Sequence, residues 1–538
     1  MILNMNGRKS SRRHLFILLA VLFPILIFQT SGITRELASQ EKRGKEIYLK
    51  GISPSGGEIT ALLGNPSVEV PASVLPCVNC HGHDGSGNPE GGIVPTNLTW
   101  EALTKPYGTT HSSGRKHPPY TERLLKRAIT MGIDPAGNAL DVTMPRYRLS
   151  LQDIADLTAY LKQLGEELAP GLTETSIRIG VILAPNKPLA EMGRAVKAAL
   201  TAYFDEMNQR GRIYNRRIDL RFAESPDSSE QRAKAAQRFI ADEQVFALVA
   251  TFMAGADEEI ASLVADKAVP LVGAFTLYPQ VGFPLNRHVF YLYSGLNGQG
   301  RALAAFATAR HTTQNPQTAI IYSDENIQRE VVEAIEKQCK QSGWTSIDKI
   351  RVAQRQFNAK SLAQELTQKG TEVVFFLAAG EAKREFLTEA EELSWKPIVL
   401  VPGSLAGQEV FEAPMSFHNR IFLSFPTLPS DQTTGGTAEY RKLAKVHKLP
   451  ATHLATQLTA LSSAKILVEG LRQAGRDLSR EKLIAAIEGL YHFQTGFTPP
   501  ITYNPNRRVG AFGAHIVSID LKDKRFVPAS EWIELTSN

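Results

Sequence analysis

Cysteine is scarce in this chain, with three residues in 538. Two of them, Cys77 and Cys80, are three residues apart, and the third, Cys339, lies far along the chain. A structural zinc centre needs four ligands at close spacing, and no suitable second pair accompanies the first. The scarcity therefore argues against zinc, and Cys339 alone is expected to be a small buried hydrophobe.

Familiar catalytic patterns are also missing. The chain has no GxxxxGK[ST] loop, no GxGxxG turn after an expected strand and no GxSxG elbow. Histidines of the C-terminal two thirds are scattered without metal-ligand spacing, among them His288, His418, His453, His492 and His515. No catalytic constellation is visible, which favours binding over turnover.

Only one long apolar run is present, LFILLAVLFPILIF at residues 15–28, and it follows the basic stretch GRKSSRRH. The run is shorter than the ~20 residues of a membrane span, so residues 1–40 are expected to be a signal peptide or an N-terminal anchor. No clean A-x-A cleavage site follows, which leaves a tether to the inner membrane open. The chain is expected to be exported to the periplasm.

Positive charge is concentrated in that first segment. The formal net charge is +6, and residues 1–28 supply four positive charges and no acidic residue, so their removal leaves +2. A nearly neutral mature chain gives no support for nucleic-acid binding.

The motif Cys77-Val78-Asn79-Cys80-His81 is the sharpest chemical signal. A disulfide is one interpretation in an oxidising compartment, whereas a thioredoxin-like pair lacks its βαβ context. C-x-x-C-H is also the attachment motif of covalent haem, in which the thiols bond the haem and the histidine is an axial iron ligand. The pentapeptide alone leaves these alternatives open.

A second axial ligand is expected if the motif holds haem. Met144 precedes a proline and an amphipathic helical pattern with Ile154, Leu157 and Leu161. The alternative Met131 falls at an expected helix end. Three histidines offer bis-histidine ligation instead: His83, His111 and His117. His83 is too near the motif, and the other two lie in an insertion, GTTHSSGRKHPP, expected to be a solvated loop.

Residues 41–165 resemble a class I cytochrome c domain. RGKEIY is similar to the family's first helix, CVNCHGHDGSGNPEGGIVPTNLT to its haem-attachment segment, and MPRYRLSLQDIADLTAYLKQL to its distal loop and last helix. The resemblance implies one covalent haem c, held by Cys77 and Cys80, with His81 and Met144 as axial ligands. The stretch 51–76 and the insertion are extra to a minimal cytochrome.

Such ligation fills both axial positions, so one-electron transfer to a periplasmic redox partner protein is expected. A run of basic residues surrounds the distal loop: Arg115, Lys116, Arg123, Lys126, Arg127, Arg146 and Arg148. These form either a docking face for an acidic partner or an ordinary solvated surface.

Residues 166–176 are expected to be a linker, and from 177 strands alternate with helices. IRIGVILA, RRIDLRF, VFALVATF, TAIIYS, EVVFFLAAG and KPIVLVPG are predicted strands separated by helical segments. This alternation predicts parallel sheets with helices on both faces. The fold class is thus a small all-α cytochrome c domain followed by a two-lobed α/β domain over 177–538.

Residues 177–538 resemble the leucine/isoleucine/valine-binding branch of the type I periplasmic binding proteins. The stretches carrying this are IRIGVILAPNKPLAEMGRAVKAALTAYFDEMNQRG, FALVATFMAGADEEIASLVADKAVPLVGAFT and the segment that begins ATQLTALSSAKILVEG. The resemblance implies two lobes joined by three crossovers that close on a small molecule. One lobe is expected near 177–297 plus 425–500.

Candidate ligand residues lie on turns after strands: Thr251, Gly255, Phe275, Thr276, Tyr278, Tyr322 and Gly380. Amino-acid binders of the family meet the ligand's carboxylate with hydroxyls and its ammonium with an acidic residue. Here the turn Val401-Pro402-Gly403-Ser404 lacks an acid, and an unpaired buried charge is costly. A ligand other than a free aliphatic amino acid is therefore expected.

Three functions follow from this combination. The favoured one is an electron-transfer cytochrome whose binding module recruits a periplasmic compound or a partner such as a dehydrogenase. The second is the substrate-binding component of an ABC-type uptake system, working with an inner-membrane transporter and carrying an appended cytochrome. A weaker third is an oxidoreductase that acts on the cleft ligand.

Overall fold

The computed structural model describes residues 37–65, 67–87, 92–165, 168–184, 189–323, 329–353, 357–378 and 380–536. The expected signal or anchor segment lies almost wholly outside these residues. Within the described ranges, no helix is long and apolar enough to cross a membrane.

The N-terminal region is mainly helical. Its helices are α1 (Ser39–Lys50), α2 (Cys77–His81), α3 (Trp100–Leu103), α4 (Glu122–Met131) and α5 (Leu151–Leu161). Thr121 and Ser150 cap α4 and α5 with side-chain oxygens that accept from Leu124 N and Asp153 N. Residues from these helices share one buried core, which includes Tyr48, Leu125 and Leu157.

Helices α1 and α5 cross in close contact. A Cβ atom at Gly44 would lie 2.0 Å from the backbone oxygen of Asp156, so only glycine allows this approach. Arg43 Nε and Nη2 donate to the two carboxylate oxygens of Asp156 at 2.6 and 2.9 Å. Tyr48 packs on Tyr160 with ring centroids 5.5 Å apart, so aromatic side chains also join the two helices.

The two extra stretches form small β-structures. Strands β1 (Thr60–Leu63), β2 (Val68–Pro71) and β5 (Arg146–Arg148) make an antiparallel sheet in the order β2-β1-β5, and a 3-10 turn, η1 (Ala72–Val74), follows β2. The later insertion forms a short hairpin, β3 (Thr109–Thr110) with β4 (Lys116–His117). These additions leave the expected helical class of the region intact.

The C-terminal region contains two lobes, each with its own sheet. The first sheet is parallel, in the order β16-β10-β9-β8-β6-β7. Its strands are β6 (Ser176–Leu183), β7 (Arg217–Glu224), β8 (Ala247–Val249), β9 (Leu271–Val272), β10 (Val289–Tyr293) and β16 (Val509–Ala511). Its helices are α6 (Ala190–Arg210), α7 (Ser229–Glu243), α8 (Asp257–Asp266), α13 (Thr434–His447), α14 (Leu454–Ala474) and α15 (Arg480–Glu488).

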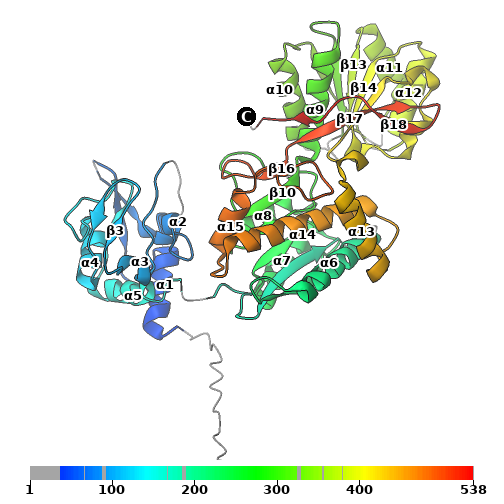
Figure 1. The fold of residues 1–538 in the computed structure, drawn as a ribbon. Helices are drawn as coiled ribbons and strands as arrows, with labels where there is room; N and C mark the ends of the chain where they lie inside the picture. The colour runs from blue at the N-terminus through cyan, green and yellow to red at the C-terminus, as the bar shows by residue number, and fades with distance from the viewer. Residues whose placement is uncertain are drawn as a thin grey trace, which may run out of the picture. The chain divides into compact units, whose positions relative to one another are not determined.

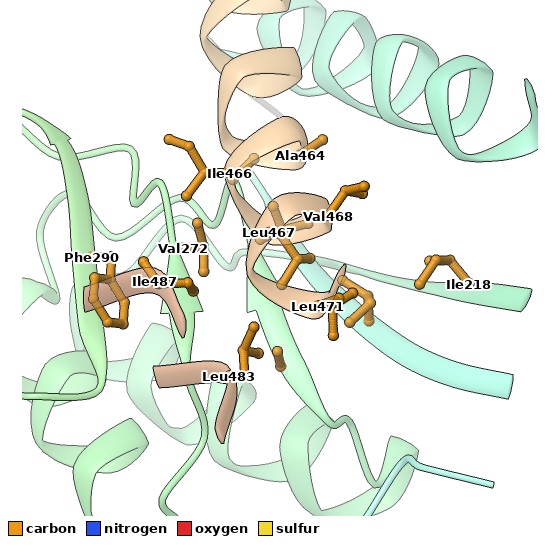
Figure 2. Packing of buried hydrophobic residues seen from close by; sticks show 14 of the residues in the cluster. Ile218, Val272, Phe290, Ala464, Ile466, Leu467, Val468, Leu471, Leu483 and Ile487 are labelled. Carbon is orange, nitrogen blue, oxygen red and sulfur yellow. The ribbon is translucent and has the colours of Figure 1, made fainter. Parts of the chain in front are cut away.

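Segments far apart in the sequence build the core of this lobe. In Figure 1, the orange α14 lies beside the green α6. Figure 2 shows side chains of α14, such as Leu467 and Leu471, meeting Leu483 and Ile487 of α15 and Val272 of β9. All of these side chains are essentially inaccessible to water, so their burial is the main stabilising contribution to the lobe.

The second sheet is mixed, in the order β12-β11-β13-β14-β15-β17-β18, and β19 also pairs with β17. Its strands are β11 (Thr318–Tyr322), β12 (Ile347–Arg351), β13 (Val373–Phe376), β14 (Ile398–Pro402), β15 (Ile421–Phe425), β17 (Gly513–Asp520), β18 (Arg525–Pro528) and β19 (Ile533–Glu534). Its helices are α9 (Gly295–Arg310), α10 (Arg329–Gln341), α11 (Ala359–Gln368) and α12 (Ala382–Glu392), and 3-10 turns are η3 (Gly403–Leu405), η4 (Gln408–Glu412), η5 (Met415–Phe417) and η6 (Pro429–Asp431).

The chain passes between the two lobes three times, after β10, after β15 and after β16. The first lobe extends past the expected limit near residue 500, because β16 pairs in parallel with β10. The expected fold class, a helical region followed by a two-lobed α/β domain, is confirmed.

Candidate haem pocket and ligand cleft

A cavity of about 960 Å³ opens in the N-terminal region, around the C-x-x-C-H motif. Cys77, Cys80, His81 and Met144 all line it. Its apolar lining comes from several elements and includes Tyr48, Leu103, Tyr120, Leu125, Ile129, Leu157 and Leu161. Its size falls within the range of cofactor-sized pockets.

His81 ends the short helix α2 and is 5 % exposed. Its Nδ1 is 2.9 Å from the backbone oxygen of Thr96, whereas its Nε2 is buried and has no hydrogen-bond partner among the described residues. Burial lowers the pKa of His81, despite the bond to Thr96. The result is a neutral, oriented imidazole with one nitrogen available, which is the arrangement of a metal-ligating histidine with its supporting carbonyl.

The two cysteines lie within one turn of helix and face the same cavity as the histidine. Cys77 is half-buried, and burial raises the pKa of its thiol to about 12. A thiol in this setting stays protonated at neutral pH and is a poor spontaneous nucleophile.

Met144 is half-buried and lines the cavity. Its loop is held by local hydrogen bonds: Met144 N donates to Asp141 O at 3.1 Å, and the Arg146 guanidinium donates to the backbone oxygens of Met144 and Leu140. Met131, by contrast, is 64 % exposed at the end of α4 and does not line the cavity. Geometry therefore favours Met144 over Met131 as the distal ligand, which stays a prediction.

The hairpin insertion is only partly the solvated loop that was expected, because Ser112, Ser113 and Gly114 are exposed but the two histidines are not. His117 is 6 % exposed, and its Nε2 lies 2.9 Å from His111 Nε2. Arg115 donates to the fully buried carboxylate of Asp134 at 2.7 Å and approaches His111 Nε2 at 3.0 Å. His111 and Arg115 both line the cavity. Packing on Tyr120 (ring centroids 4.9 Å from His117) explains why these polar residues are held inward.

The residues around this cavity fit a covalent haem. A buried imidazole nitrogen with no partner in the described part of the chain, two thiols in the same helical turn and a thioether share one largely apolar cavity. His81 and Met144 would hold the iron, and Cys77 and Cys80 would bond the macrocycle. The supporting residues Thr96 and Asp134 had no signal in the sequence, because their roles depend on contacts with residues 15 and 19 positions away.

On the first lobe, the structure brings four of the expected ligand residues together. Phe275 N donates to Thr251 O at 2.8 Å, and Phe275 pairs with Phe252 in an isolated parallel bridge. Thr251 itself is completely buried, with its hydroxyl 3.5 Å from Val249 O. Its hydroxyl is therefore part of the core and cannot meet a ligand without a rearrangement.

Asp257, which the sequence did not single out, occupies the hydrogen-bond donors of the same loops. One carboxylate oxygen accepts from Gly255 N at 3.0 Å, and the other accepts from the Thr276 hydroxyl. The Thr276 hydroxyl in turn accepts from Tyr278 N at 2.9 Å. Asp257 is also the first residue of α8, where a carboxylate is stabilised by the helix dipole. Two donors that could meet a ligand carboxylate, Gly255 N and the Thr276 hydroxyl, are thus already satisfied.

The remaining three expected ligand residues differ in their surroundings, although Tyr278 keeps its backbone bond to Thr276. Tyr278 and Tyr322 are half-buried and pack against the core of the second lobe, which contains Leu296 and Ile320. Gly380 is exposed after β13 with a φ of 76°, and a Cβ atom added there would have nothing within 4 Å. Ser323 directly follows β11, and Ser424 lies in β15. Both hydroxyls are buried and have no partner among the described residues, and neither residue had a signal in the sequence.

Comparison with known proteins defines the class of each part. The family model described as periplasmic binding protein matches residues 176–524, and the one described as cytochrome c matches residues 74–165. The chain therefore belongs to the periplasmic binding protein family, and it carries a cytochrome c domain. The search of curated proteins gave no match.

Solved structures agree on the fold of the C-terminal region. A branched-chain amino acid ABC transporter protein from Thermus thermophilus with bound valine is 17 % identical and has a TM-score of 0.55; the match covers 67 % of this chain and 98 % of that one. A fatty acid ABC transporter substrate-binding protein from Thermomonospora curvata is 15 % identical with a TM-score of 0.54, covering 69 % and 95 %. At these identities the similarity establishes the fold alone.

Proposed function

We propose that the chain is an exported c-type cytochrome that carries single electrons and is coupled to a binding module for a small ligand or a partner protein. The observation that carries this proposal is His81 Nε2, which is buried, unpartnered among the described residues and directed by Thr96 in a cavity shared with two thiols and Met144. Bound haem would supply reversible one-electron exchange between Fe(III) and Fe(II).

The chain's own residues favour electron transfer over substrate turnover at this site. His81 and Met144 would both hold the iron, and such ligation favours electron exchange over substrate binding at the metal. The apolar lining from Leu125, Leu157 and Leu161 excludes water and, with a methionine ligand, would favour the reduced state. A periplasmic redox partner protein is the natural acceptor or donor.

Covalent attachment through the two thiols gives the direct test. Denatured wild-type protein should keep its haem stain on a gel, and the Cys77→Ala/Cys80→Ala variant should lose it. Cys339→Ala is the matched control, because this buried cysteine packs in the second lobe, and it should keep the stain. Extraction of haem from the wild-type protein by acid acetone would contradict the proposal.

The second candidate function is ligand capture for an ABC-type uptake system. It is supported by the two-lobed fold, which is similar to those of the two ABC transporter proteins named above. Asp257 argues against an amino acid as the ligand. Its carboxylate already accepts from Gly255 N and Thr276 Oγ1, and it would repel a second carboxylate at that position.

A thermal-shift measurement tests whether the binding module captures a branched-chain amino acid. Ligand that binds only the folded protein stabilises it by about 2.7 kcal/mol at a hundredfold excess over Kd. Leucine, isoleucine and valine at millimolar concentration should give no shift. Micromolar leucine binding in calorimetry would overturn this expectation and make amino-acid uptake the first candidate.

A further inference from the structure

The second lobe has a cavity of its own, of about 590 Å³. It is lined by residues that immediately precede or begin three adjacent parallel strands: Thr371 and Glu372 before β13, Pro397 before β14, and Arg420 and Phe422 at β15. It therefore lies at the amino ends of these strands. Ligands of open α/β sheets bind beyond the opposite, carboxyl ends, so this cavity is separate from the expected ligand cleft.

The floor of this cavity is aromatic. Phe306, Phe422 and Trp395 all line it, and the first two rings pack with centroids 4.9 Å apart. The Trp395 indole N–H is satisfied, because it donates to Thr371 O at 2.8 Å. Thr371 is 2 % exposed, and its hydroxyl has no partner among the described residues. This part of the lining is thus mainly aromatic, because the Thr371 hydroxyl is itself inaccessible.

The rim of the cavity is cationic. Arg310, Lys396 and Arg420 line it, and none of them forms an ion pair with a described residue. Five other cations of this lobe are paired with carboxylates, namely Lys340, Lys349, Lys369, Lys383 and Arg384, whereas Lys337 and Lys360 resemble the rim cations in having no ion pair with a described residue. Glu372 is the carboxylate at the cavity, and it accepts from the Thr313 hydroxyl at 2.9 Å.

The geometry of the rim suits a planar anion. The Arg310 guanidinium lies 5.6 and 5.9 Å from the ring centroids of Phe306 and Phe422, so stacking orients it while its N–H groups stay available. Three positive charges against one negative charge attract an anion, and an arginine fork binds a carboxylate in two-point fashion.

We propose that this cavity, lined by Phe306, Trp395 and Phe422 and rimmed by Arg310, Lys396 and Arg420, is a second ligand site that binds a small aromatic carboxylate. The rings take the flat apolar part and the cations take the carboxylate. The site is independent of the expected ligand cleft and of the haem pocket.

Calorimetric titration of the full chain with 2-naphthoate tests the proposal. The wild-type protein should bind it, and the Lys396→Gln/Arg420→Gln variant should bind it at least tenfold more weakly. Both side chains are exposed, so the variant should fold normally, and Arg310→Gln provides a second, independent variant with the same expected direction. Lys360→Gln, an exposed lysine on α11 of the same lobe, is the matched control and should bind like wild type.

Two further compounds test separately whether the ligand's charge and its aromatic rings contribute to binding. Sulfate, which carries charge without a ring, and 2-naphthylmethanol, which carries the rings without charge, should each bind at least tenfold more weakly than 2-naphthoate. Sulfate binding as tight as 2-naphthoate would show that the aromatic floor has no part and would overturn the proposed ligand class. Absence of 2-naphthoate binding, or equal binding by the Lys396→Gln/Arg420→Gln variant, would overturn the site itself.

Discussion

The contact between α1 and α5 allows a sharp test, because two opposing effects of Gly44→Ala can be compared. In an open helix this change would stabilise the protein by about 1 kcal/mol through helix propensity. Here the new methyl group would lie 2.0 Å from the backbone oxygen of Asp156 and 2.8 Å from Cβ of Tyr160. Overpacking against atoms that cannot rotate away costs ~1–3 kcal/mol. Because the nearest atom belongs to the backbone, we expect the packing cost of Gly44→Ala to lie at the upper end of this range.

The net expectation is a loss of about 2 kcal/mol in the free energy of unfolding of the cytochrome domain, after subtracting the propensity gain from the packing cost. Separation of the helices would also weaken the two hydrogen bonds from Arg43 to Asp156. It would strain the bond from the Tyr48 hydroxyl to Gly82 O (2.7 Å), which ties α1 to the residue after His81. Damage at the helix contact should therefore reach the haem-binding segment.

Thermal unfolding of the full chain, followed by circular dichroism in the Soret band, reports this domain selectively. The midpoint should fall by roughly 5–15 °C, from the usual relation between free energy and melting temperature. Gly57→Ala is the matched control, because its nearest atom, Ser53 Oγ, would be 3.9 Å from the new methyl group, and such surface changes usually stay within about 0.5 kcal/mol. A Gly44→Ala protein as stable as wild type would refute the packing interpretation.

Two other predictions concern the same domain. Met144→Ala should lower the haem midpoint potential and remove the long-wavelength absorption band of iron–methionine bonding, whereas Met131→Ala should change neither; the reverse pattern would show that the distal ligand is misassigned. Burial tends to raise the pKa of Asp156, but hydrogen bonds from Arg43 and Gln152 outweigh burial and lower it. A lowered folded-state pKa gives stability that is present above the unfolded value near ~3.9 and is lost as pH falls through the folded value. Asp156→Asn should therefore lose stability at neutral pH and show a smaller further loss in urea unfolding between about pH 4 and pH 2; an unchanged acid dependence would contradict the assignment.

The sequence identified the haem motif, the helical pattern of α5 and the alternation of the α/β lobes, because each of these is encoded locally. C-x-x-C-H needs only one helical turn, and a 3.6-residue period reports one buried face. The burial of the hairpin's histidines was not predicted, because it depends on contacts that the local sequence does not encode. A polar stretch rich in glycine and proline is expected to be solvated, but His117 is buried by Tyr120 and paired with His111. Nothing in the local composition of residues 105–118 predicts those contacts.

The loops of the first lobe are a second case in which the local sequence did not predict a contact, and this contact bears on function. Thr276 is a hydroxyl after a strand, and its position alone makes it a candidate ligand residue. Its availability depends on Asp257, 19 residues earlier, whose carboxylate accepts from the Thr276 hydroxyl and from Gly255 N. A hydroxyl has a single proton to donate, so one that already serves Asp257 cannot also donate to a ligand carboxylate. The missing acid at Gly403 and the occupied donors are independent obstacles, since they concern opposite lobes and opposite ends of an amino acid. Both disfavour the same ligand class, and a compound without a free α-carboxylate is what we expect the cleft to accept.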